Sequence, residues 1–192
     1  TDLAALGIGA SVYISIFVGL SGVMQALSPM IGQLYGGKKF EAIGEEVRQG
    51  VWLSLFLTVL GSIAMCFPQP LLGIAQASPE LEEKVLLYLR VAALALPATL
   101  GFRVFASLNT AVSRPRMVML LQIGSLLLKI PLNALFIFGG LGLPAFGAPG
   151  CAIATAISAW LALLAGWLIV RYQPFYRKFT LFGKGLGAPD VK

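Results

Sequence analysis

The 192-residue chain has no histidine, only two cysteines and few charged residues. Charged residues make up 11% of it, against about a quarter in a typical soluble domain, and hydrophobic residues make up 58%. Cys66 and Cys151 do not have the spacing of a metal or redox motif, and we interpret both as small buried hydrophobic residues. The chain also lacks a nucleophile elbow, a phosphate-binding loop and a carboxylate pair within an apolar segment. We therefore expect no enzyme activity, no metal site and no cofactor.

Long apolar segments take up most of the chain. One membrane crossing needs about 20 mostly apolar residues, and the first segment is longer than that, so Pro29 predicts a bend within it. The composition therefore predicts an all-α integral membrane protein with about five transmembrane helices. The segments run roughly over Leu3–Leu34, Val51–Phe67, Leu81–Val112, Met117–Phe138 and Pro149–Tyr172.

Lysine and arginine alternate between the segments that connect these crossings. The basic stretches follow the first, third and fifth crossings, and the positive-inside rule places them, with the C-terminal tail, in the cytoplasm. Five crossings then place Thr1 outside, so we expect a chain that lacks one upstream helix. The net charge of +6 forms no basic run with interleaved aromatic residues, which argues against a nucleic-acid partner. The basic residues are Lys38, Lys39 and Arg48, then Arg114 and Arg116, then Arg171, Arg177, Lys178 and Lys184.

Polar residues within the predicted crossings recur at helical spacing, so each set lies on one helix face. Such residues usually face a protein interior or a water-filled cavity. A stripe of glycine and serine in the first crossing favours close helix packing instead. The polar sets are Gln122, Ser125, Lys129 and Asn133; Thr99, Arg103, Ser107, Thr110 and Arg114; and Cys151, Thr155 and Ser158. The small-residue stripe is Gly7, Ser11, Ser15, Gly19 and Gly22.

Lys129 lies near the middle of its crossing, where a lysine costs about 2.5–3.5 kcal/mol on insertion scales. Six of the eight acidic residues lie outside the predicted crossings, and the other two, Glu82 and Glu83, lie in the first turn of the third, so neither Lys129 nor Arg103 has a counter-ion at its depth in this chain. Either the Lys129 ammonium loses its proton, or its partner is another helix, a lipid headgroup or a substrate. Pro131 frees the carbonyl group of Leu127, and this carbonyl, Lys129 and Asn133 predict a polar cluster at mid-depth.

Several stretches resemble the multidrug and toxic compound extrusion (MATE) family over nearly the whole chain. In order they read LAALGIGAS at 3–11, PMIGQLYGG at 29–37, VRQG at 47–50, IPLNALFIFG at 130–139 and GAPGCAIATAI at 147–157. The resemblance implies two six-helix lobes around a central cavity in an inner membrane. It also implies antiport of cationic or amphiphilic drugs against protons or sodium ions.

By this resemblance, residues 1–172 correspond to helices two to six of the N-terminal lobe, and residues 173–192 to a basic cytoplasmic linker between lobes. The first helix, in which the family carries an acidic coupling residue, and the C-terminal lobe would then belong to the rest of the same polypeptide. The expected partners are membrane lipid, small organic cations and these two missing parts. The energy source would be a proton or sodium gradient.

The resemblance also assigns roles to individual residues. Asn133 matches the second asparagine of the family's Asn-Ile-Pro-x-Asn stretch, and Lys129 stands where the first asparagine is usual. A fixed positive charge opposes a sodium ion in the same pocket. Our hypothesis is that Lys129 pairs with the acid of the missing helix and that protons drive transport.

The candidate site for cation coupling and substrate binding therefore comprises Lys129, Asn133, Arg103, Gln122 and Thr155. The alternative is a flippase of the same superfamily for anionic lipid-linked molecules, which Lys129 and Arg103 would also suit.

Overall fold

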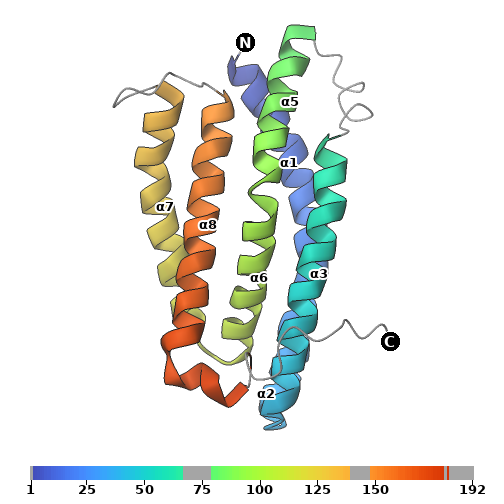
Figure 1. Cartoon of the computed structure of the whole chain (residues 1–192), viewed down its shortest axis with the longest axis vertical. Coiled ribbons are helices and arrows are strands. Elements are labelled where there is room, and N and C mark those ends of the chain that lie inside the picture. The colour runs from blue at the N-terminus through green and yellow to red at the C-terminus, as the bar shows by residue number, and fades with distance from the viewer. Residues whose placement is uncertain (1, 67–78, 139–147, 180, 182–192) are drawn as a thin grey trace.

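The computed structural model describes residues 2–66, 79–138, 148–179 and 181. Figure 1 shows these residues as long helices that run side by side along one axis. Every regular element in the described ranges is helical, so the all-α prediction is confirmed. The elements are α1 (Asp2–Gln25), α2 (Leu27–Gly36), α3 (Phe40–Cys66), α5 (Pro79–Ala93), α6 (Leu96–Ala111), α7 (Pro115–Phe138), α8 (Ala148–Tyr172) and the short 3-10 helix η1 (Pro174–Phe179).

The helices are long and apolar enough to cross a membrane. Four described spans qualify by length and composition, over Gly7–Gly36, Phe40–Cys66, Pro115–Ile137 and Pro149–Tyr172. The pair Glu83–Ala93 and Leu96–Ala111 makes a fifth if the bent pair is counted as one span. The prediction of about five crossings is therefore confirmed.

Two prolines interrupt the helices in the same way. A proline ring clashes with the carbonyl group four residues earlier; α1 ends four residues before Pro29, and α5 ends four residues before Pro97. The bend predicted at Pro29 is thus a break at Ala26, whereas the break before Pro97 was not predicted. Here α5 and α6 meet at 43°. The indole Nε1 of Trp160 in α8 donates a hydrogen bond to the Leu94 carbonyl oxygen in this break, at 3.0 Å.

Two expectations about α3 were wrong. The helix begins at Phe40 and not near Val51, so Arg48 lies within α3 and not in a connecting segment. Its first turns are helical because Ile43 is fully buried and Val47, one turn later, packs against the same core. Cys66 was expected to be buried, but it ends α3 on an exposed surface.

The small-residue stripe of α1 is exposed along its length: Gly7, Ser11, Ser15, Gly19 and Gly22. A Cβ atom added at any of its three glycines would meet nothing within 4 Å. Within the described part of the chain, therefore, no helix makes the close approach that this stripe favours.

The basic stretches gather at one end of the bundle, where α2 meets α3, α6 meets α7, and η1 follows α8 (Figure 1). The assignment of this end to the cytoplasm stays a prediction. Lys184, most of the predicted linker and the uncharged connection 139–147 lie outside the described residues.

The helix η1 packs across this end of the bundle instead of extending away from it. Tyr176 and Phe179 are 1% and 0% exposed. The Tyr176 hydroxyl donates a hydrogen bond of 2.6 Å to Oδ1 of the fully buried Asn109, whose Nδ2 donates to the Phe105 carbonyl oxygen at 2.8 Å. The first residues of the predicted linker thus hold the ends of α2, α3 and α6 together.

Candidate functional site

A cavity of about 230 Å³ lies where α6, α7 and α8 meet, with one side chain from α1. Four of the five predicted site residues line it: Arg103, Gln122, Lys129 and Thr155. The structure therefore brings together side chains from three helices that the sequence could place only on separate faces. The full lining is Phe17, Thr99, Phe102, Arg103, Gln122, Ser125, Lys129, Thr155, Ser158, Ala159 and Ala162.

The α7 helix carries three of these residues because its polar side chains share one face. Gln122, Ser125 and Lys129 line the cavity, whereas Leu126 and Leu127 are 62% and 63% exposed. A helix with its polar stripe inward and leucines outward suits a lipid surrounding. Pro131 lies within α7 without ending it, and neither Pro131 nor Leu127 lines the cavity. The polar cluster of the Leu127 carbonyl group, Lys129 and Asn133 stays a prediction.

Three of the four hydroxyl groups that line the cavity, those of Thr99, Thr155 and Ser158, already donate hydrogen bonds within their own helices. Thr155 donates to the Cys151 carbonyl oxygen at 2.8 Å, and Ser158 donates to Ala154 at 2.7 Å. Each hydroxyl oxygen keeps lone pairs that can accept a hydrogen bond. The strong donors left in the cavity are the Arg103 guanidinium, the Lys129 ammonium and the Gln122 amide.

Positive charge dominates the cavity. No acidic side chain is among its lining residues, and Lys129 forms no ion pair within the described part of the chain. The Arg103 guanidinium lies 5.4 Å from the centroid of the Phe17 ring, an arrangement that stabilises a cation weakly. An unpaired ammonium in a low-dielectric surrounding favours the approach of an anion. A carboxylate that approached Lys129 from outside the described residues would therefore be stabilised.

Asn133 lies one turn beyond Lys129 on α7 but does not line the cavity. Its Oδ1 atom is buried and has no hydrogen-bond partner among the described residues. An unsatisfied buried acceptor costs about 1–3 kcal/mol. This atom therefore marks a place where a donor or a cation from outside the described residues would be stabilised.

Sequence reasoning missed some of the lining. Phe17 and Phe102 carry no polar signal and became visible only in the fold. Thr99, Ser125 and Ser158 belonged to the predicted polar faces but were not included in the candidate site, although they line the same cavity. In the described ranges, no group of three or more His, Cys, Asp or Glu residues could hold a metal ion.

A bundle of membrane-crossing helices around a charged internal cavity defines a class: an α-helical, multi-pass membrane protein with a polar site within the bilayer. The family model described as MatE matches residues 1–135. The chain belongs to this family, as the resemblance predicted.

Curated relatives carry names that agree with this family. A probable multidrug resistance protein NorM from Neisseria meningitidis serogroup B is 37% identical over 190 residues, covering 98% of this chain and 41% of the relative. The multidrug resistance protein PmpM from Pseudomonas aeruginosa is 35% identical over 184 residues, covering 95% and 39%. This chain thus spans about two fifths of the length of the curated relatives it matches.

A solved structure agrees with the fold. The solved structure is described as the MATE transporter NorM-NG in a complex that includes a monobody. Its sequence is 32% identical to this chain, and the two structures superpose with a TM-score of 0.77. The match covers 99% of this chain and 41% of the NorM-NG chain.

Proposed function

We propose that this chain forms part of a secondary active antiporter, which exports cationic or amphiphilic drugs and toxins in exchange for protons or sodium ions. The observation that carries this proposal is the open cavity at α6, α7 and α8, which the half-buried Arg103 and Lys129 both line. Charged residues at such a depth are costly and are typical of transport pathways. The names of the NorM and PmpM relatives support the same activity.

We propose further that the described helices supply five of the six helices of one lobe, and that the same polypeptide supplies the rest. Two features support an additional helix that carries an acid. The cavity has no acidic lining residue, and the Oδ1 atom of Asn133, on the same helix as Lys129, lacks a donor among the described residues. The small-residue stripe of α1 is also uncovered and offers a surface on which a further helix could pack.

In this mechanism Lys129 forms an ion pair with that acid. When a proton reaches the acid, its charge is lost and the attraction to Lys129 disappears, so the pair opens and the lobe is free to bend. Sodium is disfavoured as the coupling ion because Lys129 keeps a positive charge beside the place where the ion would bind. Gln122 and Thr155 would hold the polar end of a substrate while the pair is open.

The test uses the complete transporter that contains this chain, reconstituted in proteoliposomes. Uptake of a fluorescent cationic dye is followed under an imposed proton gradient and, separately, under a sodium gradient. Lys129→Asn restores the residue that the family resemblance expects at this position, and Lys39→Asn, at the exposed connection between α2 and α3, is the matched control.

In Lys129→Asn we expect the dye flux driven by the proton gradient to weaken, or the sodium gradient to drive the dye instead. In Lys39→Asn we expect the proton-driven dye flux to stay unchanged. Unchanged proton-driven flux in Lys129→Asn would make this lysine a structural residue only.

The second candidate is a flippase for anionic lipid-linked molecules. It is favoured by one observation, that both charged residues of the cavity are cations. If no dye moves under either gradient, a fluorescent anionic lipid-linked substrate replaces it in the same vesicles. Transport of that substrate, abolished in Lys129→Asn, would favour the flippase over the antiporter.

A further inference from the structure

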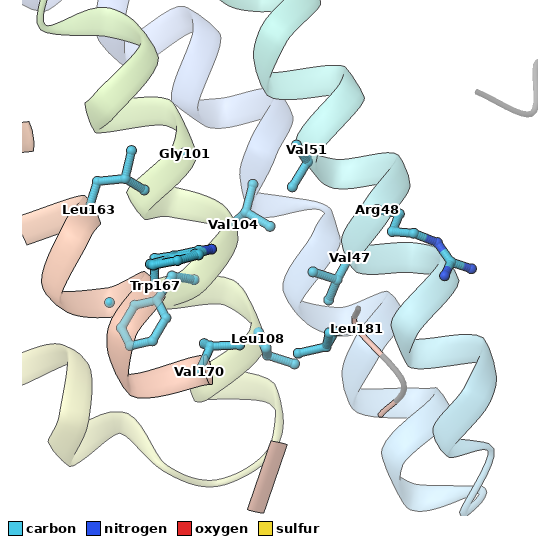
Figure 2. Close-up of a pocket in the computed structure, with 12 residues that line it drawn as sticks. Val47, Arg48, Val51, Gly101, Val104, Leu108, Leu163, Trp167, Val170 and Leu181 are labelled. Carbon is cyan, nitrogen blue, oxygen red and sulfur yellow. The ribbon is translucent and has the colours of Figure 1, made fainter. Parts of the chain in front are cut away.

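A second cavity, larger and apolar, lies on another part of the lobe, and neither the proposed antiport nor the flippase uses it. It measures about 390 Å³ and lies between α3, α6 and α8. Figure 2 shows Val104 and Leu108 of α6 along its floor, with α3 on one side and α8 on the other. Leu181, which follows η1, lies at its lower end. Pockets that hold small molecules measure about 300–1,000 Å³, so this one has room for an extended hydrocarbon chain.

The groove continues the surface that faces lipid. On α3 the residues Val59 and Ile63 are 60% and 54% exposed, and on α8 Leu164 and Leu168 are 51% and 44% exposed. Helix α6 packs against both α3 and α8 and so fills the space behind the groove. An acyl chain in this groove would therefore be continuous with the surrounding hydrocarbon.

Polar groups lie partway along the groove, with Leu163 above Trp167 and Val170 below it in Figure 2. The Trp167 indole lies across it, with the ring nitrogen directed toward α3 (Figure 2), and forms no hydrogen bond within the described residues. Trp167 is 46% exposed, and the Arg171 guanidinium lies 5.4 Å from its ring centroid. Arg48 rises from the opposite wall, but its guanidinium is turned away from the groove (Figure 2) and forms an ion pair with Glu45 at 3.8 Å. Tryptophan and arginine at one level are typical of the boundary between hydrocarbon and headgroups.

The charges select among possible occupants. No acidic residue lines the groove, and Arg48 is already paired with Glu45, whereas Arg171 stands beside Trp167 without an ion pair among the described residues, so a cationic drug would find no carboxylate in the groove and one available cation at its edge. An anionic phospholipid would find the Arg171 cation for its phosphate, the Trp167 indole N–H for an ester oxygen and an apolar slot for its chain. We propose that this groove binds one acyl chain of an anionic phospholipid, with the headgroup held by Arg171 beside Trp167. This proposal does not depend on the transport function.

The first measurement uses Trp167 as the reporter. In the complete transporter, Trp52, Trp160 and every tryptophan outside this chain are replaced by phenylalanine, and phosphatidylglycerol with brominated acyl chains is titrated into detergent micelles that hold this variant. We expect quenching of Trp167 that saturates at a low lipid fraction and is weaker with brominated phosphatidylcholine. A second variant keeps only Trp160, which is 44% exposed. Parallel quenching of both reporters would indicate bulk lipid contact and would overturn the proposal.

The second measurement is native mass spectrometry of the protein without tryptophan substitutions, after delipidation and addition of phosphatidylglycerol. Val51→Phe should fill the groove and abolish the retained lipid, whereas Val59→Phe, two turns along α3 on the lipid-facing side, should not. Arg171→Gln should weaken retention about fivefold, the effect of one cation near an anionic headgroup. Arg116→Gln, an exposed arginine at the same end, is its control. Equal retention in Val51→Phe, Val59→Phe and the parent would refute the site.

Discussion

Replacement of Tyr176 by phenylalanine tests how η1 is held on the bundle. The substitution keeps the buried ring and removes only the hydroxyl that donates to Asn109 Oδ1 at 2.6 Å. Because Asn109 is 0% exposed, water does not replace the lost donor. The Asn109 oxygen is then left unsatisfied in the core, while the contacts of Phe179 and the rest of η1 remain.

The magnitude follows from this burial. A buried acceptor that loses its partner costs about 1–3 kcal/mol. If that cost applies to the docking of η1, the undocked population rises by about 5- to 150-fold. Removal of both partners, in Tyr176→Phe combined with Asn109→Leu, leaves no orphaned polar side chain. We therefore expect the double variant to recover part of the loss.

Tryptic cleavage after Arg177 and Lys178 measures this population, since both residues lie within η1 and are exposed. The protein in detergent micelles is cleaved under conditions in which η1 opens and closes faster than trypsin cuts, and the rate is compared with that of the parent. Tyr172→Phe, at an exposed tyrosine that ends α8, is the matched control. A cleavage rate that is equal in Tyr176→Phe and Tyr172→Phe would refute this account of η1 docking.

Two further predictions rest on single contacts. Burial raises the pKa of Tyr176 above its ordinary value of 10.0, so the folded state holds the phenolic proton more tightly than the unfolded state. The stabilisation is complete below about pH 10 and is lost as pH rises through the folded pKa. Tryptic cleavage in η1 should therefore accelerate over that range. A cleavage rate independent of pH between 9 and about 11 would contradict the burial of the Tyr176 hydroxyl in docked η1. A Cβ atom at Gly150 would meet the Phe136 backbone of α7. Gly150→Ala should therefore lower the stability of the protein by about 1–3 kcal/mol, measured by thermal unfolding. Gly124→Ala is the control, because a Cβ atom there meets nothing within 4 Å, and it should leave the stability unchanged or slightly higher. Equal effects of the two substitutions would argue against a close approach of α7 and α8.

The sequence determined the number of crossings, the helical class and the inward face of α7. These features are local, because each follows from the length of an apolar run or from residues three and four positions apart. Pro29 predicted the interruption between α1 and α2 for the same reason. The equivalent break before Pro97 could have been predicted by that rule, since the proline ring acts on its own helix.

The tertiary structure alone decided which faces meet. Arg103, Lys129 and Thr155 lie on three different helices. Their spacing along the chain does not predict that they share a cavity, because a shared cavity depends on how the helices rotate and pack against one another. The same holds for Phe17, whose apolar ring carries no signal of a site. The docking of η1 depends on a hydrogen bond between residues 67 positions apart. Local periodicity determines secondary structure, whereas side chains distant in sequence come together only through packing, and it is packing that created both cavities.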